Sequence, residues 1–246
     1  MKNTYLILLL LLSGQILYGQ AKSSVDLSFD ANRSYRLLIK NGEEDHLQTI
    51  IDVLDDAESP LMSFGLGLHY NQRLSRNLLI QSGIEYQRFG FQIKNQELRW
   101  GSEYNPATGE IIDDPSLPNS YTAKTLFRFW SVPLLFRYEF GLAKIQPFIE
   151  AGASFSFLQD VRSRTSLDNE RPNTTTLSND QNVVYSTFQL FAHVDIGINY
   201  QLQNNWQIFT SLGYNRSFSD TNQIDSPINQ RQFSASVSLG VRRLLD

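Results

Sequence analysis

Eight stretches of the chain alternate apolar and polar residues with a period of two. Three very tight turns and four long polar gaps alternate between these stretches. A period of two directs successive side chains to opposite faces of a β-strand. The clearest stretch sets Phe64, Leu66, Leu68 and Tyr70 against Gly65, Gly67, His69 and Asn71. The rhythm predicts an all-β, eight-stranded antiparallel up-and-down barrel with both chain ends on one side, although ten strands remain an alternative.

The connections also carry predictions. The tight turns fall near residues 74–77, 141–144 and 203–205, and the long gaps near residues 40–60, 98–122, 160–182 and 220–229. In the first gap Leu47, Ile50, Ile51 and Leu54 recur at helical spacing after Asp45, a suitable N-cap. We expect a short helix there, with an unstructured acidic loop as the alternative.

The two faces of the predicted strands differ in a way that decides the type of barrel. One face carries large aliphatic residues along its length, and the other carries Gly, Ser, Asn and Gln with isolated charges. A water-soluble barrel is apolar inside, whereas a transmembrane barrel is apolar outside. Small polar residues suit a narrow lumen, so the pattern indicates a transmembrane barrel. Aromatic residues form two predicted interface belts: Tyr70, Tyr138, Tyr200 and Trp206 near the tight turns, and Tyr86, Trp130, Phe155 and Tyr214 toward the long gaps.

The polar face supplies a predicted network of charges inside the lumen. Its members are Glu85, Arg137, Glu139, Glu150, His193 and Asp195. Isolated buried charges are costly, so we expect Arg137 to be bridged by one of the acids Glu85, Glu150 or Asp195, which would plug the lumen. A proton or ion path is the alternative.

Composition and the first residues agree with an exported protein. After Lys2, residues 5–12 are uninterruptedly apolar but too few for a membrane-spanning helix, and Gly19 precedes a suitable cleavage point. We therefore expect a signal peptide over residues 1–19, with a retained anchor as the alternative, and one barrel domain over residues 20–246 in the bacterial outer membrane. The chain has no cysteine, which excludes disulfides and a lipoprotein anchor. Its net charge of −4 argues against a nucleic-acid partner.

Candidate chemistry is sparse. His46, His69 and His193 lack the spacing of a metal site, and no serine lies in a nucleophile elbow. We expect no enzyme activity, no metal and no cofactor. Cations gather toward the long gaps, where they could pair with lipopolysaccharide phosphates or remain solvated: Arg88, Lys94, Arg99, Lys124, Arg128, Arg162 and Arg164.

Two adjacent segments carry a family resemblance. Residues 130–138 read WSVPLLFRY, residues 146–154 read QPFIEAGAS, and residues 83–86 read GIEY with Gly90 beyond them. These segments resemble the PorT-like outer-membrane β-barrel family of Bacteroidetes. The resemblance implies an integral outer-membrane barrel, and a few relatives assist secretion of proteins across that membrane. The chain departs from outer-membrane barrels in ending on Asp246 after Leu245, without a terminal aromatic residue.

The sequence thus predicts a monomeric outer-membrane barrel with a structural or accessory role. Loops on a rigid scaffold commonly carry binding, so we expect outer-membrane lipid around the wall and a protein partner at the external loops. A small passive channel is one alternative, although eight strands leave room only for side chains. An outer-membrane lipid-modifying enzyme is the other, and it requires a catalytic group near the rim.

Overall fold

The computed structural model describes residues 23–44, 46–98, 107–108, 118–141, 144–168, 173–177, 185–203, 205–222 and 226–245. The predicted signal peptide lies outside them. In chain order the elements are β1 Ser23–Lys40, α2 His46–Ala57, β2 Glu58–Arg73, β3 Leu78–Glu97, β4 Ser120–Glu139, β5 Ile145–Leu167, β6 Asn173–Leu177, β7 Phe188–Gln201, β8 Trp206–Ser217 and β9 Ile228–Leu245. No helix among the described residues is long and apolar enough to cross a membrane.

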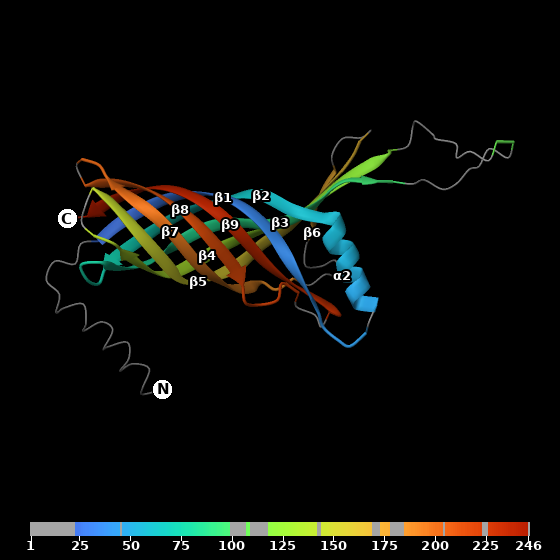
Figure 1. Ribbon diagram of the computed structural model, residues 1–246, viewed down its shortest axis with the longest axis horizontal. Coiled ribbons are helices and arrows are strands. Elements are labelled where there is room, and N and C mark those ends of the chain that lie inside the picture. The colour runs from blue at the N-terminus through green and yellow to red at the C-terminus, as the bar shows by residue number, and fades with distance from the viewer. Residues whose placement is uncertain are drawn as a thin grey trace.

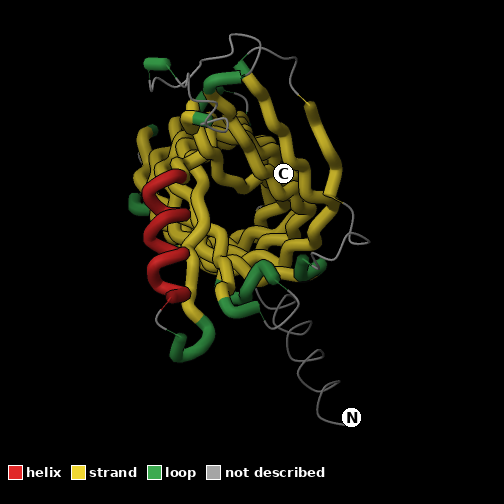
Figure 2. The backbone as a smooth tube through the Cα atoms, turned by 90° about the vertical axis from the view of Figure 1, so that its right-hand side faces the viewer, coloured by secondary structure: helices red, strands yellow, loops and turns green. Residues whose placement is uncertain are grey.

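Eight of the strands form a closed antiparallel ring (Figures 1 and 2). Each strand pairs with its neighbour along the chain except that β5 pairs directly with β7, and β1 pairs with β9 to close the ring. The short β6 pairs with the end of β5 as a hairpin outside the ring. The eight-stranded barrel predicted from the sequence is therefore confirmed.

The two ends of the barrel differ in their connections. Ser23 pairs with Leu245, so both ends of the described chain lie at the end that carries the tight turns. Gly141 and Asn205 adopt positive φ values of 82° and 63° in two of these turns, a conformation that glycine and asparagine tolerate best. The predicted helix is confirmed as α2 at the opposite, long-loop end, where Leu47 and Ile51 are buried. Its predicted N-cap, Asp45, lies outside the described residues.

The outer wall of the barrel is apolar. Leu66, Leu134, Ile196 and Leu239 are 48%, 42%, 56% and 62% exposed, whereas Glu85 and Arg137 are only 7% and 3% exposed. Contiguous exposed apolar surface of this extent is characteristic of a protein surface that contacts lipid. Side chains with a period of two therefore direct aliphatic groups outward and polar groups into the ring, as the alternation predicts.

The third long gap contains more strand than the sequence pattern predicts. The pattern places the start of this gap near residue 160, but β5 extends to Leu167. Beyond the upper aromatic belt the outward positions become charged, as at Arg128, so the pattern that marks a membrane strand stops there while the hydrogen-bonded ladder continues. The third long gap consequently contains strand at both β5 and β6.

One irregularity lies in the middle of the wall. The β3–β4 ladder has no pairs at Gly83 and Ile84, opposite Val132 and Pro133. Proline has no N–H to donate, so an interior strand proline interrupts the ladder on one side. On its other side Pro133 still pairs in register with Ser154 of β5.

Candidate functional site: a sealed lumen

Side chains fill the lumen in three layers between the tight-turn end and the long-loop end. The first is a layer of ion pairs, the second a small polar chamber, and the third a cluster of aromatic rings. Each layer is built from inward-facing positions on several strands, so the ring as a whole positions it.

The ion-pair layer is centred on Arg242 of β9, which is fully buried. Its guanidinium donates from Nε and Nη2 to the two carboxylate oxygens of Asp26, each at 2.8 Å. Its Nη1 donates to Glu139 Oε1, also at 2.8 Å. Arg73 Nη2 donates to the other oxygen of Glu139 at 2.8 Å, and Asn199 Nδ2 donates to Oε1 at 2.9 Å. Bidentate arginine–carboxylate pairs are among the strongest hydrogen bonds in proteins, so this layer closes the tight-turn end firmly.

Arg137 lies beside this layer. Its Nε donates to Glu150 Oε2 at 2.6 Å, across the β4–β5 ladder, and its Nη1 lies 3.9 Å from Asp26 Oδ2. Its guanidinium lies 4.2 Å from the ring centroid of Phe148 and 5.3 Å from that of Phe209. A Cβ on Gly197 or Gly240 would come within 2.5 Å and 2.1 Å of these two rings, so glycine makes the space that the rings fill.

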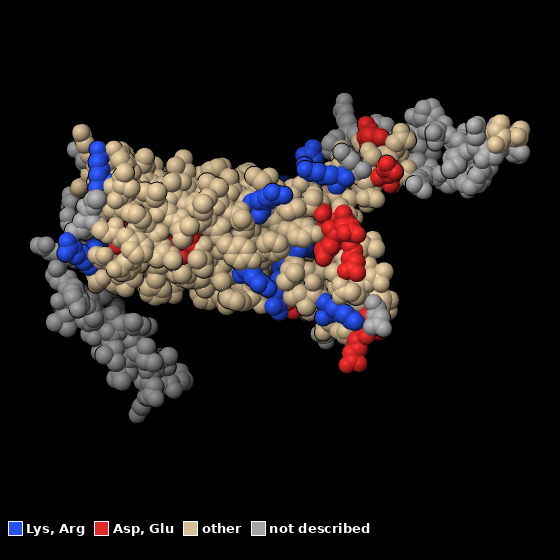
Figure 3. Space-filling view, in the orientation of Figure 1, with Lys and Arg blue, Asp and Glu red and all other residues tan. Residues whose placement is uncertain are grey.

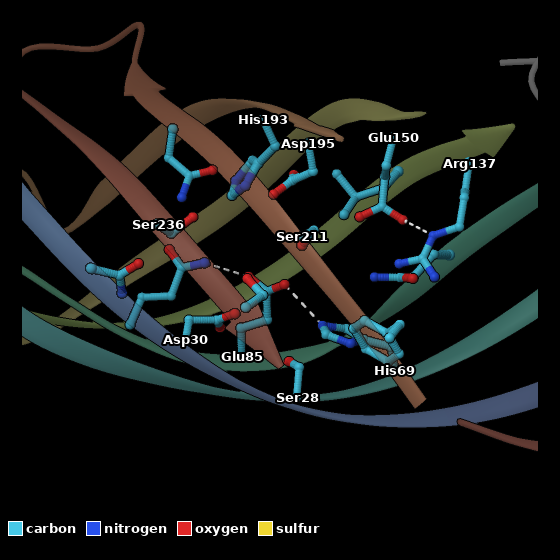
Figure 4. A pocket seen from close by; sticks show the side chains of 17 residues that line it. Ser28, Asp30, His69, Glu85, Arg137, Glu150, His193, Asp195, Ser211 and Ser236 are labelled. Carbon is cyan, nitrogen blue, oxygen red and sulfur yellow. Dashed lines mark hydrogen bonds and ion pairs between the residues drawn. The ribbon is translucent and has the colours of Figure 1, made fainter. Parts of the chain in front are cut away.

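The second layer is a polar chamber of about 50 Å³ (Figure 4). Its walls include Asp30, Glu85, Glu150, His193 and Asp195, which point toward one another from different strands. A volume of roughly 10–15 Å³ holds one water molecule, so the chamber has room for a few waters. No group of three His, Asp or Glu side chains among the described residues is arranged to hold a metal ion.

Two histidines are fixed on opposite walls of the chamber. His69 Nε2 lies 2.9 Å from Glu85 Oε1, and Gln87 Nε2 donates to the other oxygen of Glu85 at 2.5 Å. His193 Nε2 lies 2.6 Å from the Ser154 hydroxyl. Both serine and histidine are buried, which makes this contact part of the packing rather than a solvent-accessible nucleophile.

The third layer is a plug of aromatic rings at the long-loop end of the lumen. Its buried members are Phe89, Phe127, Phe129, Val161, Tyr185 and Phe191. The rings of Phe89 and Phe191 are stacked with centroids 4.7 Å apart, and Phe129 meets both of them edge to face. Such contacts bury large apolar area with favourable ring geometry, so the plug is a dry core within the upper part of the barrel.

Above the plug, α2 is attached to the rim by polar contacts. Tyr35 donates to Asp55 of α2 at 3.2 Å, and Arg36 donates to Glu58, at the start of β2, and to Gln230. Arg36 also lies 3.8 Å above the ring of Phe91. Burial and the neighbouring Asp55 carboxylate raise the pKa of Tyr35 to about 12, so its hydroxyl remains a donor at physiological pH.

The structure brings most of the predicted lumen residues together. Glu85, Arg137, Glu139, Glu150 and His193 are buried and Asp195 faces the chamber. Of the three acids considered for Arg137, Glu150 forms the hydrogen bond, while Glu85 contacts His69 instead. The predicted belt residues lie on the outer wall, where Tyr70, Trp130, Tyr138, Trp206, Tyr214 and Phe155 are 40–49% exposed and Tyr86 and Tyr200 are partly exposed.

Sequence reasoning missed several residues of these layers. Asp26 and Arg242 form a fully buried bidentate ion pair, and Asp30 lines the chamber. Arg242 continues the inward series of Ser238 and Gly240, so the period of two would have identified it had the last strand been extended by one residue beyond Val241. The aromatic plug was missed because its rings occupy inward positions, where the pattern for a membrane strand predicts polar residues.

Charges on the outer surface separate into zones. Figure 3 shows a wide band with few charged side chains, flanked by Lys and Arg side chains at the tight-turn end and toward the long-loop end. At the long-loop end the basic side chains are followed by acidic ones on and near α2, such as Asp55 and Asp56. An apolar band flanked by polar zones matches the profile of a bilayer.

Comparison with known proteins supports the same assignment. A sequence model of the family described as "Outer membrane protein beta-barrel domain" matches residues 51–223. Among curated proteins, none matches this sequence.

Three solved structures with a similar course of the chain are distant from it in sequence. Neisserial surface protein A is 14% identical, with 90% of this chain and 96% of that chain covered and a TM-score of 0.43. OprG from Pseudomonas aeruginosa is 10% identical, with coverage of 91% and 96% and a TM-score of 0.44. The outer membrane protease OmpT from Escherichia coli is 8% identical, with coverage of 91% and 97% and a TM-score of 0.46. Because the family match covers more than half of the chain, this protein belongs to the outer membrane protein beta-barrel domain family and is a β-barrel of the bacterial outer membrane.

Proposed function

We propose that this protein is a sealed monomeric barrel with a structural or accessory role in the outer membrane, and that its external end binds a protein partner. The observation that carries the proposal is the filled lumen. The layer around Arg242 closes one end and the rings around Phe191 close the other, with a chamber of about 50 Å³ between them.

A sealed lumen should not conduct ions, and this expectation distinguishes the proposed function from that of a passive channel. The ion pairs of Arg242 must lose both partners, and the packed rings must separate, before a hydrated ion could pass. We expect purified protein in a planar bilayer to give no stable conductance steps. Large, stable open steps from protein whose folded state is verified would overturn the sealed barrel and favour the channel.

The external end offers a surface for a partner. Helix α2 lies at one side of the rim at this end (Figures 1 and 2), and its outward residues Ile50 and Val53 are 43% and 62% exposed. Two exposed apolar side chains three positions apart on a helix form one face. This face lies beyond the lipid-facing band, so it meets the external solution, and apolar residues there favour contact with another protein.

Site-specific photocrosslinking in cells tests this surface. A photoreactive residue at Val53 should give one discrete adduct with a protein, and the same residue at Arg76, in a tight turn at the periplasmic end, should not give it. Mass spectrometry then identifies the adduct, and the purified partner should protect Val53 from labelling. A folded barrel with no adduct at Val53, or the same adduct at Arg76, would contradict an external partner.

The finer assignment to the PorT-like group suggests what the partner does. In that group a few members assist protein secretion, and we infer an accessory role of this kind. Deletion of the gene should then reduce the amount of particular proteins at the cell surface, and the protein crosslinked at Val53 should be needed for the same effect. Normal secretion in the deletion strain, together with an adduct at Val53 in cells that carry the gene, would leave the barrel and its partner but overturn the role in secretion.

The geometry gives less support to a lipid-modifying enzyme. The closest serine–histidine contact, Ser154 with His193, is buried in the lumen below the aromatic plug. A hydrolase for membrane lipids needs its nucleophile within reach of the bilayer surface. We therefore propose no catalytic activity, and unchanged lipid composition after gene deletion is the expected result.

A further inference from the structure

The outer wall of β3, β4 and β5 carries an unusual concentration of cations just above the aromatic belt. The outward positions there hold Arg88, Lys124, Arg128, Arg162 and Arg164. Arg88 pairs across the ladder with Arg128, and Lys124 pairs with Arg164. Like charges directly opposite each other on one face of a sheet are destabilising, so this wall favours an anion that bridges them.

Among the residues that the structure describes, one carboxylate lies among these cations, and it leaves most of their charge uncompensated. Asp160 accepts hydrogen bonds from Arg128 in a close ion pair, and its Oδ2 lies 3.4 Å from Arg162 Nε. The Arg162 side chain is 46% exposed, and Lys124 and Arg164 are exposed. A single acid beside five basic residues leaves a site that is strongly attractive to a multivalent anion.

The two guanidiniums nearest the belt are held in place on the wall. Arg88 lies 3.9 Å from the ring centroid of Phe64, and its Nε donates to the Tyr86 hydroxyl at 3.1 Å. Arg128 is fixed by Asp160. Both are partly exposed, so fixed donors remain available to an incoming oxygen. A guanidinium with a fixed orientation suits phosphate particularly well.

An apolar groove descends from these guanidiniums toward the middle of the membrane. It is about 620 Å³ in volume, its floor is made by Leu27, Leu66, Leu68 and Ile84, and Tyr86 and Trp130 flank it. Along β3 the successive outward residues are Ile84, Tyr86 and Arg88, so the groove runs from aliphatic through aromatic to cationic. This order matches an acyl chain that leads up to an anionic headgroup at the interface.

We propose that this groove binds a diphosphorylated glycolipid of the outer leaflet. One acyl chain lies on the aliphatic floor, and one phosphate binds between Arg88 and Arg128. The second cation pair, Lys124 with Arg164, lies four residues farther along β4, which is about 13 Å at the rise of a β-strand. A headgroup with two separated phosphates reaches both pairs, whereas a phospholipid with a single phosphate reaches one.

Native mass spectrometry of the full barrel in detergent tests the proposal with hexa-acylated lipid A as the probe. The wild type should retain the diphosphorylated form. Replacing the cations Arg88 and Arg164 should reduce the retained amount roughly tenfold or more, because each removed contact is a charge-assisted hydrogen bond. The test variant is Arg88→Gln with Arg164→Gln. The control variant is Arg216→Gln with Arg243→Gln, which removes two exposed cations from β8 and β9, strands that do not line the groove, and should leave retention unchanged.

Further probes distinguish the chemistry of the ligand. Wild-type protein should retain lipid A much better than its dephosphorylated form and better than phosphatidylglycerol. Equal retention of either would overturn the proposal, and so would an equal loss in the control variant. Heat-modifiable mobility on gels checks folding, and if the test variant does not fold, Ile84→Trp replaces it by filling the groove without changing charge. Undiminished lipid A binding by folded Ile84→Trp would overturn the groove as the site.

Discussion

The same strands line the lumen with opposite chemistry in the two parts of the barrel. Where β4 crosses the membrane, Ser131 and Arg137 face inward and Leu134 faces outward. Toward the long-loop end of the same strand, Phe127 and Phe129 face inward and Arg128 faces outward. The inversion occurs at Trp130, the belt residue between these parts.

The inversion shows that the medium around the wall decides which residues the ring encloses. Lipid tails are as apolar as leucine, so burying aliphatic groups inside the membrane part gives no hydrophobic gain. Polar side chains are instead collected in the lumen, where they satisfy one another. Above the belt the wall meets water, and the ordinary hydrophobic effect again drives phenylalanine inward. The barrel is therefore a membrane protein in one part and resembles a soluble protein in the other.

The strongest test of the membrane part is Arg242→Met. Removing the guanidinium leaves Asp26 and Glu139 buried without their main partner, and breaking a buried pair in this way costs about 3–5 kcal/mol. Unfolding in urea, followed by heat-modifiable mobility, measures the loss. The control is the neighbouring Arg243→Met, whose side chain is exposed and lies 5.6 Å from the ring of Trp206, and it should cost no more than about 1 kcal/mol. Equal effects at both positions would mean that the lumen pair is not a structural element.

Introducing a charge on the outside compares the two surroundings directly. Leu134→Arg places a cation against lipid near mid-membrane and should cost about 2–4 kcal/mol, whereas near the interface the cost falls to about 0–1 kcal/mol. Leu37→Arg, at an outward position of β1 above the belt whose cross-strand neighbour Arg231 is already paired with Asp220, should therefore be nearly neutral. Urea titration of the two variants measures the difference. Similar stability of both would place the lipid boundary elsewhere on the wall.

The sequence predicted the membrane part well because its pattern is simple. Leu66, Leu134, Ile196 and Leu239 were expected on one face and Glu85 and Arg137 on the other, and a period of two is sufficient for that result. The tight turns and the closed ring of eight strands followed from the spacing of the same pattern. The helix α2 was predicted from Leu47 and Ile51, which recur at helical spacing and are buried.

The periodicity of the sequence does not predict which charges pair in the lumen, nor does it predict the aromatic plug. Periodicity says that Arg137 faces inward, but the choice of Glu150 over Glu85 depends on register between strands, which a single sequence does not give. The plug around Phe129 and Phe191 depends on strands continuing beyond the membrane, where the rule for inside and outside changes. A pattern read with one rule along the whole chain therefore does not predict this core.

Valine-to-alanine substitutions, which remove two methyl groups, distinguish apolar packing in the plug from apolar packing against lipid. Val161→Ala in the plug should cost about 2 kcal/mol, since the deleted groups lose their burial and leave a cavity in a dry core. Val132→Ala, which faces lipid at 43% exposure, should cost less than about 0.5 kcal/mol because lipid tails replace the missing contacts. Equilibrium unfolding in urea measures both. A larger loss for Val132→Ala than for Val161→Ala would contradict a water-driven core above the belt.

The smallest expected effect is confined to the rim. Tyr35→Phe removes the hydrogen bond to Asp55 and should weaken the attachment of α2 by about 0.5–1.5 kcal/mol without changing the stability of the ring. Because the pKa of Tyr35 is raised in the folded state, its contribution to stability is fully present at pH values below the ordinary tyrosine pKa near 10. This contribution is lost only as the pH rises toward the folded-state pKa of about 12. The difference between wild type and variant should therefore be constant from about pH 6 to about pH 9. Hydrogen exchange of the α2 amides measures this stability difference between wild type and variant, with the amides of β4 as the internal control. Faster exchange in β4 as well would mean that the helix and the barrel unfold as one unit, and that the soluble-like part is not separable from the membrane part.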